Sequence, residues 1–144
     1  MPAPQTYKNH ARIVPIYHIG VFFPLAANLL WAAYRLTGDV TGDSVMSLIV
    51  ALALLLMFFS LRVQVLTVQD RVIRLEMRLR LQKILPADLL AKSDALTVPQ
   101  LIALRFASDA ELPALVRDVL SGSLTTQKDI KLRVKDWQAD YQRA

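Results

Sequence analysis

Few residues in this chain could do chemistry, and they form no catalytic or metal-binding pattern. There are two histidines, His10 and His18, and no cysteine. The lack of cysteine excludes disulfides, thiolate zinc sites and cysteine nucleophiles. His10 lies in a polar segment and His18 in an apolar one, so we expect no shared histidine site. None of the four glycines belongs to a phosphate-binding loop. We therefore predict a protein that is not an enzyme, with no cofactor, no metal and no evident small-molecule substrate.

Two polar side chains within apolar sequence are a further place where chemistry could occur. His18 and Asn28 lie in a segment of 22 residues, 13–34, that contains no Lys, Arg, Asp or Glu. Polar groups at membrane depth either mark an ion path or form hydrogen bonds between helices. We favour the second interpretation, because neither residue has a charged partner in the apolar segments. Pro24 predicts a kink that frees the carbonyl of Gly20.

The basic residues are concentrated in the segment 62–85. Six basic and two acidic side chains give this segment a net charge of +4, out of +5 for the whole chain. Such a cluster directly after an apolar segment suits anionic lipid headgroups or a protein partner. Nucleic acid is not expected as a partner, because no stacking aromatic residues interleave with the cations. The predicted headgroup- or partner-binding residues are Arg62, Arg71, Arg74, Arg78, Arg80 and Lys83.

Two apolar segments must position these residues. Segment 13–34 is long enough for about 33 Å of helix, and segment 44–61 has eighteen residues without charge. The sequence TGDVTGDS (Thr37–Ser44) between them predicts a tight turn, with Ser44 or Asp43 capping the next helix. A calcium loop is disfavoured there, because two carboxylates are too few. No proline or glycine interrupts Ser44–Leu85, which predicts one helix of roughly 63 Å.

These segments define the expected fold class and domain organisation. We predict an all-α membrane protein with an N-terminal arm (1–12) and a transmembrane hairpin (13–61, with spans of about 13–36 and 44–61). The second helix then continues as a basic, amphipathic, coiled-coil-like stalk (62–85), and a tail of short helices follows (86–144). Basic residues flank the hairpin at both of its open ends. The positive-inside rule therefore places both termini in the cytoplasm.

The stalk also has an apolar pattern. Five residues recur at alternating spacings of three and four, as the a and d positions of a coiled coil do; they are Val65, Val68, Val72, Leu75 and Leu79. Leu66, Ile73, Met77 and Leu81 widen this apolar surface. Acidic and basic residues four apart, Asp70 with Arg74 and Glu76 with Arg80, favour the helix. Such a helix must bury one side against a partner helix or against the membrane surface.

Pro86 ends the stalk, and the tail that follows should contain several short helices. Thr97 with Gln100 has the spacing of a capping box and predicts a helix to about Ala107. Ser108 with Glu111 has the same spacing and predicts a helix to Leu120, closed by Gly122. A last helix should begin at Thr125 or Thr126 and carry one apolar face of Ile130, Val134, Trp137 and Tyr141. About fifty residues make a small core, so we expect the tail to pack on the stalk or on another subunit. Trp137 is its candidate interface residue.

Three segments resemble a known family: YKNHARIVPIYH (Tyr7–His18), LIALRFASDAELPALV (Leu101–Val116) and IKLRVKDWQADY (Ile130–Tyr141). The family is one of small two-span bacterial membrane proteins, catalogued as domain of unknown function 6526. The resemblance implies a multi-pass protein of the bacterial inner membrane. It brings no catalytic or ligand-binding residues with it.

Two hypotheses of function follow. In the first, the protein is a non-enzymatic membrane protein that acts by association, either as a homo-oligomer or as an accessory subunit of a membrane complex. In the second, the basic helix binds anionic lipid, or the protein takes part in transport through a pore. The wide apolar surface of the stalk favours the first hypothesis.

Overall fold

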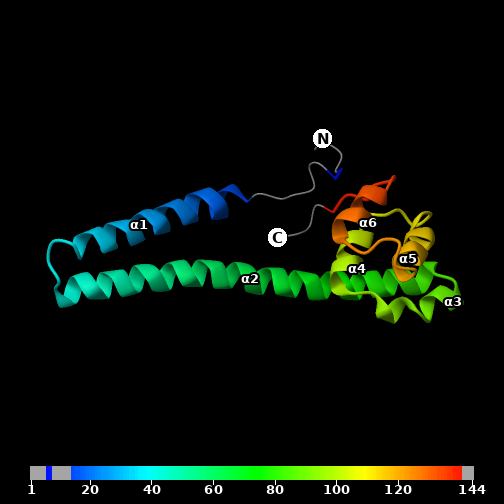
Figure 1. Cartoon of the computed structure of the whole chain (residues 1–144), viewed down its shortest axis with the longest axis horizontal. Helices are drawn as coiled ribbons and strands as arrows, with labels where there is room; N and C mark the ends of the chain where they lie inside the picture. The colour runs from blue at the N-terminus through cyan, green and yellow to red at the C-terminus, as the bar shows by residue number, and fades with distance from the viewer. Residues whose placement is uncertain (1–5, 8–13, 141–144) are drawn as a thin grey trace. The chain divides into compact units, whose positions relative to one another are not determined.

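The computed structural model describes residues 6–7 and 14–140, and every regular element in it is a helix (Figure 1). This confirms the predicted all-α fold class. The elements in chain order are η1 (Ile16–Val21), α1 (Phe22–Arg35), α2 (Gly42–Ile84), α3 (Ala87–Leu90), η2 (Ser93–Ala95), α4 (Val98–Leu104), α5 (Leu112–Leu120) and α6 (Gln127–Arg133). The chain divides into two compact units, one of residues 12–66 and one formed mainly by 67–144. Most of the predicted arm (1–12), with His10, lies outside the described residues.

The first unit contains the two apolar helices. The continuous stretch of η1 and α1, Ile16–Arg35, and the helix α2 are both long and apolar enough to cross a membrane. The predicted uninterrupted helix from Ser44 onward is confirmed, because α2 runs for 43 residues. It starts two residues earlier than predicted. Ser44 and Thr41 bond reciprocally: each backbone N–H donates to the other's hydroxyl, at 3.2 and 2.9 Å.

The helix before Pro24 differs from the ordinary α-helix that the sequence predicts. Residues Ile16–Val21 form a π-helix, and the N–H of Phe22 donates to the carbonyl of Tyr17, five residues back. Proline at position 24 has no N–H to donate to the carbonyl of Gly20, and a π-helical turn directly precedes this interruption of the α-helical hydrogen bonds. The sequence indicated an irregularity near Pro24 but not its form.

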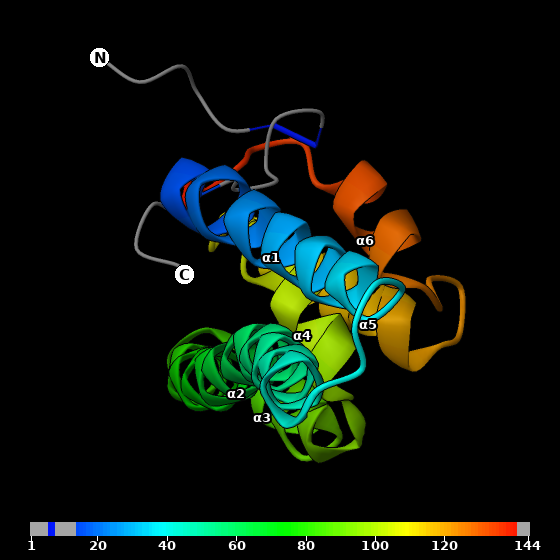
Figure 2. The same ribbon diagram turned by 90° about the vertical axis from the view of Figure 1, so that its left-hand side faces the viewer.

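The second unit is a small helical domain built on the second half of α2. The side chains of Ile73, Met77, Leu81 and Leu85 on α2 belong to one core with those of the tail helices. Figure 2 looks nearly along α2, and the tail helices gather on one side of it. The core includes Leu101 and Leu104 of α4, and Leu112 and Val116 of α5, together with Ile130 of α6. The prediction that the tail packs on the stalk is therefore confirmed.

Two of the predicted tail helices have different bounds in the structure. The capping box of Thr97 and Gln100 is present at the start of α4. However, α5 begins at Leu112 and not at Ser108, although the Glu111 carboxylate accepts a bond from the N–H of Ser108 as predicted. The same carboxylate also accepts bonds from the N–H groups of Lys135 and Asp136. A turn replaces the first predicted turn of helix. Gly122 closes α5 with φ of 79°, as predicted.

The last predicted helix is shorter than expected. It is capped by Thr126 with Asp129 and ends at Arg133, since Val134 is extended (φ −63°, ψ 124°). The chain then runs back beside α4, where Trp137 pairs with Ala107 in a β-bridge and the N–H of Gln138 donates to the carbonyl of Phe106 at 2.8 Å. The prediction that Trp137 lies on a helical face was wrong, and Tyr141 lies outside the described residues. Ile130 and Val134 are buried as expected.

Candidate association surface

The second half of α2 has two apolar faces, one covered by the tail and one exposed. On one face, Ile73, Met77 and Leu81 are 1–5% exposed because the tail covers them. The other face is the predicted apolar stripe, which we call the stalk stripe: Val65, Val68, Val72, Leu75 and Leu79 are 47–61% exposed. At about 100° per residue, the two faces lie roughly 180° apart around the helix. The tail therefore buries one apolar face of α2 and leaves the other exposed.

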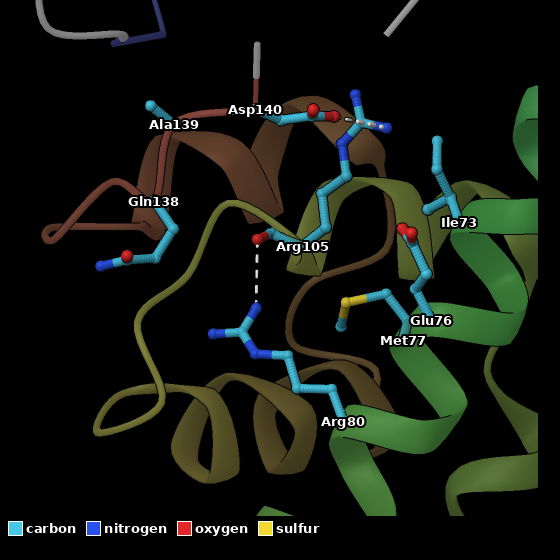
Figure 3. A pocket seen from close by; sticks show the side chains of 8 residues that line it. All are labelled: Ile73, Glu76, Met77, Arg80, Arg105, Gln138, Ala139 and Asp140. Carbon is cyan, nitrogen blue, oxygen red and sulfur yellow. Dashed lines mark hydrogen bonds and ion pairs between the residues drawn. The ribbon is translucent and has the colours of Figure 1, made fainter. Parts of the chain in front are cut away.

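Arg80 fixes the tail on its side of α2. Its Nη2 donates to the carbonyl of Ala107 at 2.6 Å and its Nη1 to the carbonyl of Arg105 at 3.2 Å. Its Nε donates to the carboxylate of Asp109 at 2.8 Å. Figure 3 shows Arg80 reaching from α2 to the carbonyl of Arg105. The guanidinium therefore holds the loop between α4 and α5, so Arg80 is engaged within the chain and not directed at a headgroup.

Of the other five predicted basic residues, two contact side chains of this chain and three are exposed. Arg78 forms an ion pair with Asp94 at 3.3 Å. The guanidinium carbon of Arg62 lies 5.7 Å from the centre of the Tyr17 ring. The remaining three, Arg71, Arg74 and Lys83, are exposed. The pairs predicted within the stalk helix, Asp70 with Arg74 and Glu76 with Arg80, do not form in the described part of the chain, where Arg80 pairs with Asp109.

A small cavity lies between α2 and the end of the tail. It measures about 180 Å³ and is lined by Ile73, Glu76, Met77, Arg80, Arg105, Gln138, Ala139 and Asp140. Figure 3 shows the carboxylate of Asp140 directed at the guanidinium of Arg105, 3.4 Å away. The guanidinium carbon of Arg105 also lies 4.6 Å from the centre of the Phe106 ring. These contacts hold the last described residues against α4, and the lining residues include no nucleophile beside a base.

The membrane-length helices bring together residues that the sequence did not single out. The Tyr17 ring stacks on that of Phe58, with centroids 4.1 Å apart, and its hydroxyl donates to the Phe58 carbonyl at 2.8 Å. Phe22 and Phe59 complete this aromatic cluster. It borders a cavity of about 330 Å³ that His18 and Arg62 also line. The helix-to-helix hydrogen bond therefore comes from Tyr17. The signal in the sequence is that aromatic residues lie near the start of the first apolar segment, at Tyr17 and Phe22, and near the end of the second, at Phe58 and Phe59.

The two predicted intramembrane polar residues are not brought together. The Nδ1 atom of His18 lies 3.0 Å from the carbonyl oxygen of Val14 and 3.2 Å from its nitrogen, just before the start of η1. Asn28 lies instead on a separate cavity of about 440 Å³ with Asp43 and Ser47 of α2. The two residues therefore do not form one continuous polar site in this unit.

Trp137 packs against the tail core. Its ring lies 4.8 Å from that of Phe106, centroid to centroid, at an interplanar angle of 33°. Phe106 is fully buried, whereas Trp137 is half-buried. Across the described residues, no group of three His, Asp or Glu side chains is placed to hold a metal ion. The stalk stripe starts at Val65 in the first unit and continues over 68–79 in the second, and its residues stay 47–61% exposed.

This architecture defines an all-α class of protein with two apolar helices of membrane-spanning length, the second of which continues into a small helical domain. The chain belongs to a family of unknown function, DUF6526, whose family model matches residues 1–144. The resemblance found from the sequence is thereby confirmed. No curated protein and no solved structure matches the chain.

Proposed function

We propose that the protein is a non-enzymatic, multi-pass membrane protein of the bacterial inner membrane that acts by association through the stalk stripe. The observation that carries this proposal is the division of α2 into two apolar faces, one covered by the tail and one exposed. The tail already covers the face opposite the stripe. The exposed face therefore remains available for another helix, either in a homo-oligomer or in a complex where this chain is an accessory subunit.

The uncovered surface is large enough to drive association. Fully burying one Val or Leu side chain stabilises by about 1.5–3 kcal/mol. Because the five stripe residues are about half exposed, covering them contributes roughly 4–7 kcal/mol per chain before the entropy of association is subtracted. The charge distribution supports a cytoplasmic location for the stalk, since the net charge of +4 lies just after the second apolar segment.

A second candidate function is binding of anionic lipid by the exposed cations of the stalk. Arg71, Arg74 and Lys83 are exposed, and each basic residue near an anionic membrane surface contributes about 1 kcal/mol. Arg62, held near Tyr17, follows directly after the uncharged part of α2. In this case the stalk stripe would lie on the membrane surface and not against another helix.

Site-directed spin labelling separates these functions, because the chain contains no cysteine. A single cysteine is introduced as Leu75→Cys in the stripe, with Met77→Cys on the tail face as the control. The labelled protein is reconstituted into bilayers with and without anionic lipid. Helix association makes the label at position 75 inaccessible both to oxygen and to a water-soluble nickel chelate, as the buried control is. Surface binding makes it accessible to oxygen alone, and only with anionic lipid. Full access to the nickel chelate at position 75 would refute both functions.

A further inference from the structure

We propose that the partner of the stalk stripe is the same stripe of a second copy of this chain, in a parallel and in-register two-stranded coiled coil. This inference rests on the proposed function and names its partner. Three features of the second half of α2 carry it: the residues of the stripe, the charges beside it and the position of the tail.

Three of the five stripe residues have the composition of a two-stranded seam. In a heptad register, Val65, Val72 and Leu79 occupy the a positions, and Val68 and Leu75 the d positions. β-Branched residues at a, here Val65 and Val72, with leucine at d, here Leu75, favour two strands over three or four; Val68 at d and Leu79 at a do not follow this rule. Valine is also a poorer helix former than alanine or leucine. Valine therefore does not stabilise four turns of a solvent-exposed helix, but it does stabilise a seam in which its side chain is packed.

The direction of pairing follows from the continuity of α2. The helix runs without a break from the apolar segment into the stalk, Gly42–Ile84. Two copies inserted with the same topology therefore leave the membrane in the same direction and at the same depth. Their stalks meet parallel and in register, which brings each stripe residue opposite its own copy.

One of the two charged contacts beside the stripe is attractive in this arrangement, and the other joins like charges. Arg71 and Arg78 occupy g positions, and Glu76 and Lys83 occupy e positions. In a parallel dimer, a g residue faces the e residue five positions later on the partner helix. Arg71 of each copy then faces the e-position Glu76 of the other, giving two attractive pairs; Glu76 also borders the cavity beside the tail. Arg78 would face Lys83, a like-charge contact that the exposed carboxylate of Asp94, 3.3 Å from Arg78, offsets only in part.

The tail does not obstruct this seam. Beside the stripe it covers Ile73, Met77 and Leu81, which fall at b, f and c positions and point away from the partner in a coiled coil. It also covers Leu85, a g position that lies six residues beyond Leu79, the last residue of the stripe. Arg80, which clamps the loop between α4 and α5, also lies at a b position. A second copy can therefore pack on the stripe while each tail stays on its own stalk.

Cysteine crosslinking in native membranes tests the geometry. Leu75→Cys places a thiol at a d position, and Arg74→Cys places one on the adjacent, outward position of the same helix. After expression in bacterial membranes and mild oxidation, we expect a disulfide-linked dimer for Leu75→Cys and little or none for Arg74→Cys. Equal crosslinking of the two variants, or none for either, overturns the proposal.

A charge exchange tests the partner's identity. Arg71→Glu turns two attractive pairs into two repulsive ones, which should weaken dimerisation by about tenfold in detergent. The double variant Arg71→Glu/Glu76→Arg should restore it, because the pairs are reversed and not lost. If the double variant does not dimerise more strongly than Arg71→Glu, the proposal that two copies of the stripe pair with each other is overturned. If the stripe is nevertheless inaccessible to both probes at position 75, the proposed association stands and its partner is a different protein. Access to the nickel chelate overturns both.

Discussion

Replacing Arg80 with methionine should detach the loop between α4 and α5 from the stalk. Methionine keeps much of the apolar stem of arginine but removes the guanidinium. That group donates to the carbonyls of Arg105 and Ala107 and to the carboxylate of Asp109. The substitution therefore tests whether Arg80 is a structural clamp in the tail unit or an uncommitted cation of the stalk.

The expected loss comes mainly from the two carbonyls. The Asp109 side chain is 70% exposed, so its ion pair with Arg80 contributes little. Ala107 is fully buried, and its carbonyl would lose a donor where water has poor access. Hydrogen bonds to charged groups contribute about 1.5–3 kcal/mol each. Allowing water to satisfy the more accessible carbonyl in part, we expect the free energy of unfolding of the tail to fall by about 2–3 kcal/mol.

Trp137 provides the assay, because its ring packs on Phe106 within the same unit. The chain has two tryptophans, so in a Trp31→Phe background the fluorescence comes from Trp137 alone. In urea titrations of the detergent-solubilised protein, Arg80→Met should lower the unfolding midpoint by about 1–2 M. Arg74→Met, at an exposed position of the same helix, should change the free energy of unfolding by less than about 0.5 kcal/mol. An unchanged midpoint for Arg80→Met, or an equal fall in both variants, would refute the assigned role of Arg80.

Two further substitutions test the tail with the same titration. Ile130→Ala, at a fully buried position of α6, should lose about 2–4 kcal/mol. Leu132→Ala, 56% exposed on the same helix, should lose less than about 0.5 kcal/mol; similar losses would contradict the described core. Gly122→Ala should lose about 1–2 kcal/mol through its left-handed backbone alone, because an added methyl group meets no atom within 4 Å. Gly122→Asn should lose less, since asparagine tolerates that backbone, and the reverse order would contradict this explanation.

Features that depend on local sequence were predictable. The uninterrupted α2 follows from the absence of proline and glycine between Ser44 and Leu85. The caps at Thr97 and Thr126 follow from side chains that bond to backbone three residues away. The closing of α5 by Gly122 follows from the preference of glycine for positive φ. Each signal lies within one or two helical turns of its effect.

Features in which a side chain bonds to residues far away in the sequence were not predictable. Glu111 has the spacing to cap a helix from Ser108, but its carboxylate also accepts from Lys135 and Asp136, 24 and 25 residues away. Those bonds form where the chain after Val134 is extended. The spacing of the apolar residues Val134 and Trp137 had predicted a helix there. Neither competing arrangement has a stronger local signal, so only the packed tail decides between them.

Arg80 shows the same limit within the candidate site. Arg80 lies four positions after Glu76 on the same helix. An ion pair between residues at this spacing contributes only about 0.2–0.5 kcal/mol. The alternative is a set of three hydrogen bonds to a loop 25–29 residues further on, two of them to backbone carbonyls that need a donor. The second arrangement prevails because unsatisfied buried carbonyls cost more than one exposed ion pair contributes.

The two apolar faces of the stalk are not interchangeable, and this bears on both proposed functions. The face under the tail combines Met77 and Leu81, which adapt to an irregular surface, with the hydrogen-bonding fork of Arg80. The stalk stripe instead has valine at regular seam positions, and no cation lies within it. In a parallel dimer, Arg74 remains outside the seam on each copy. Association through the stripe would therefore bring two sets of outward cations together, and a dimer would bind an anionic membrane surface more strongly than one chain.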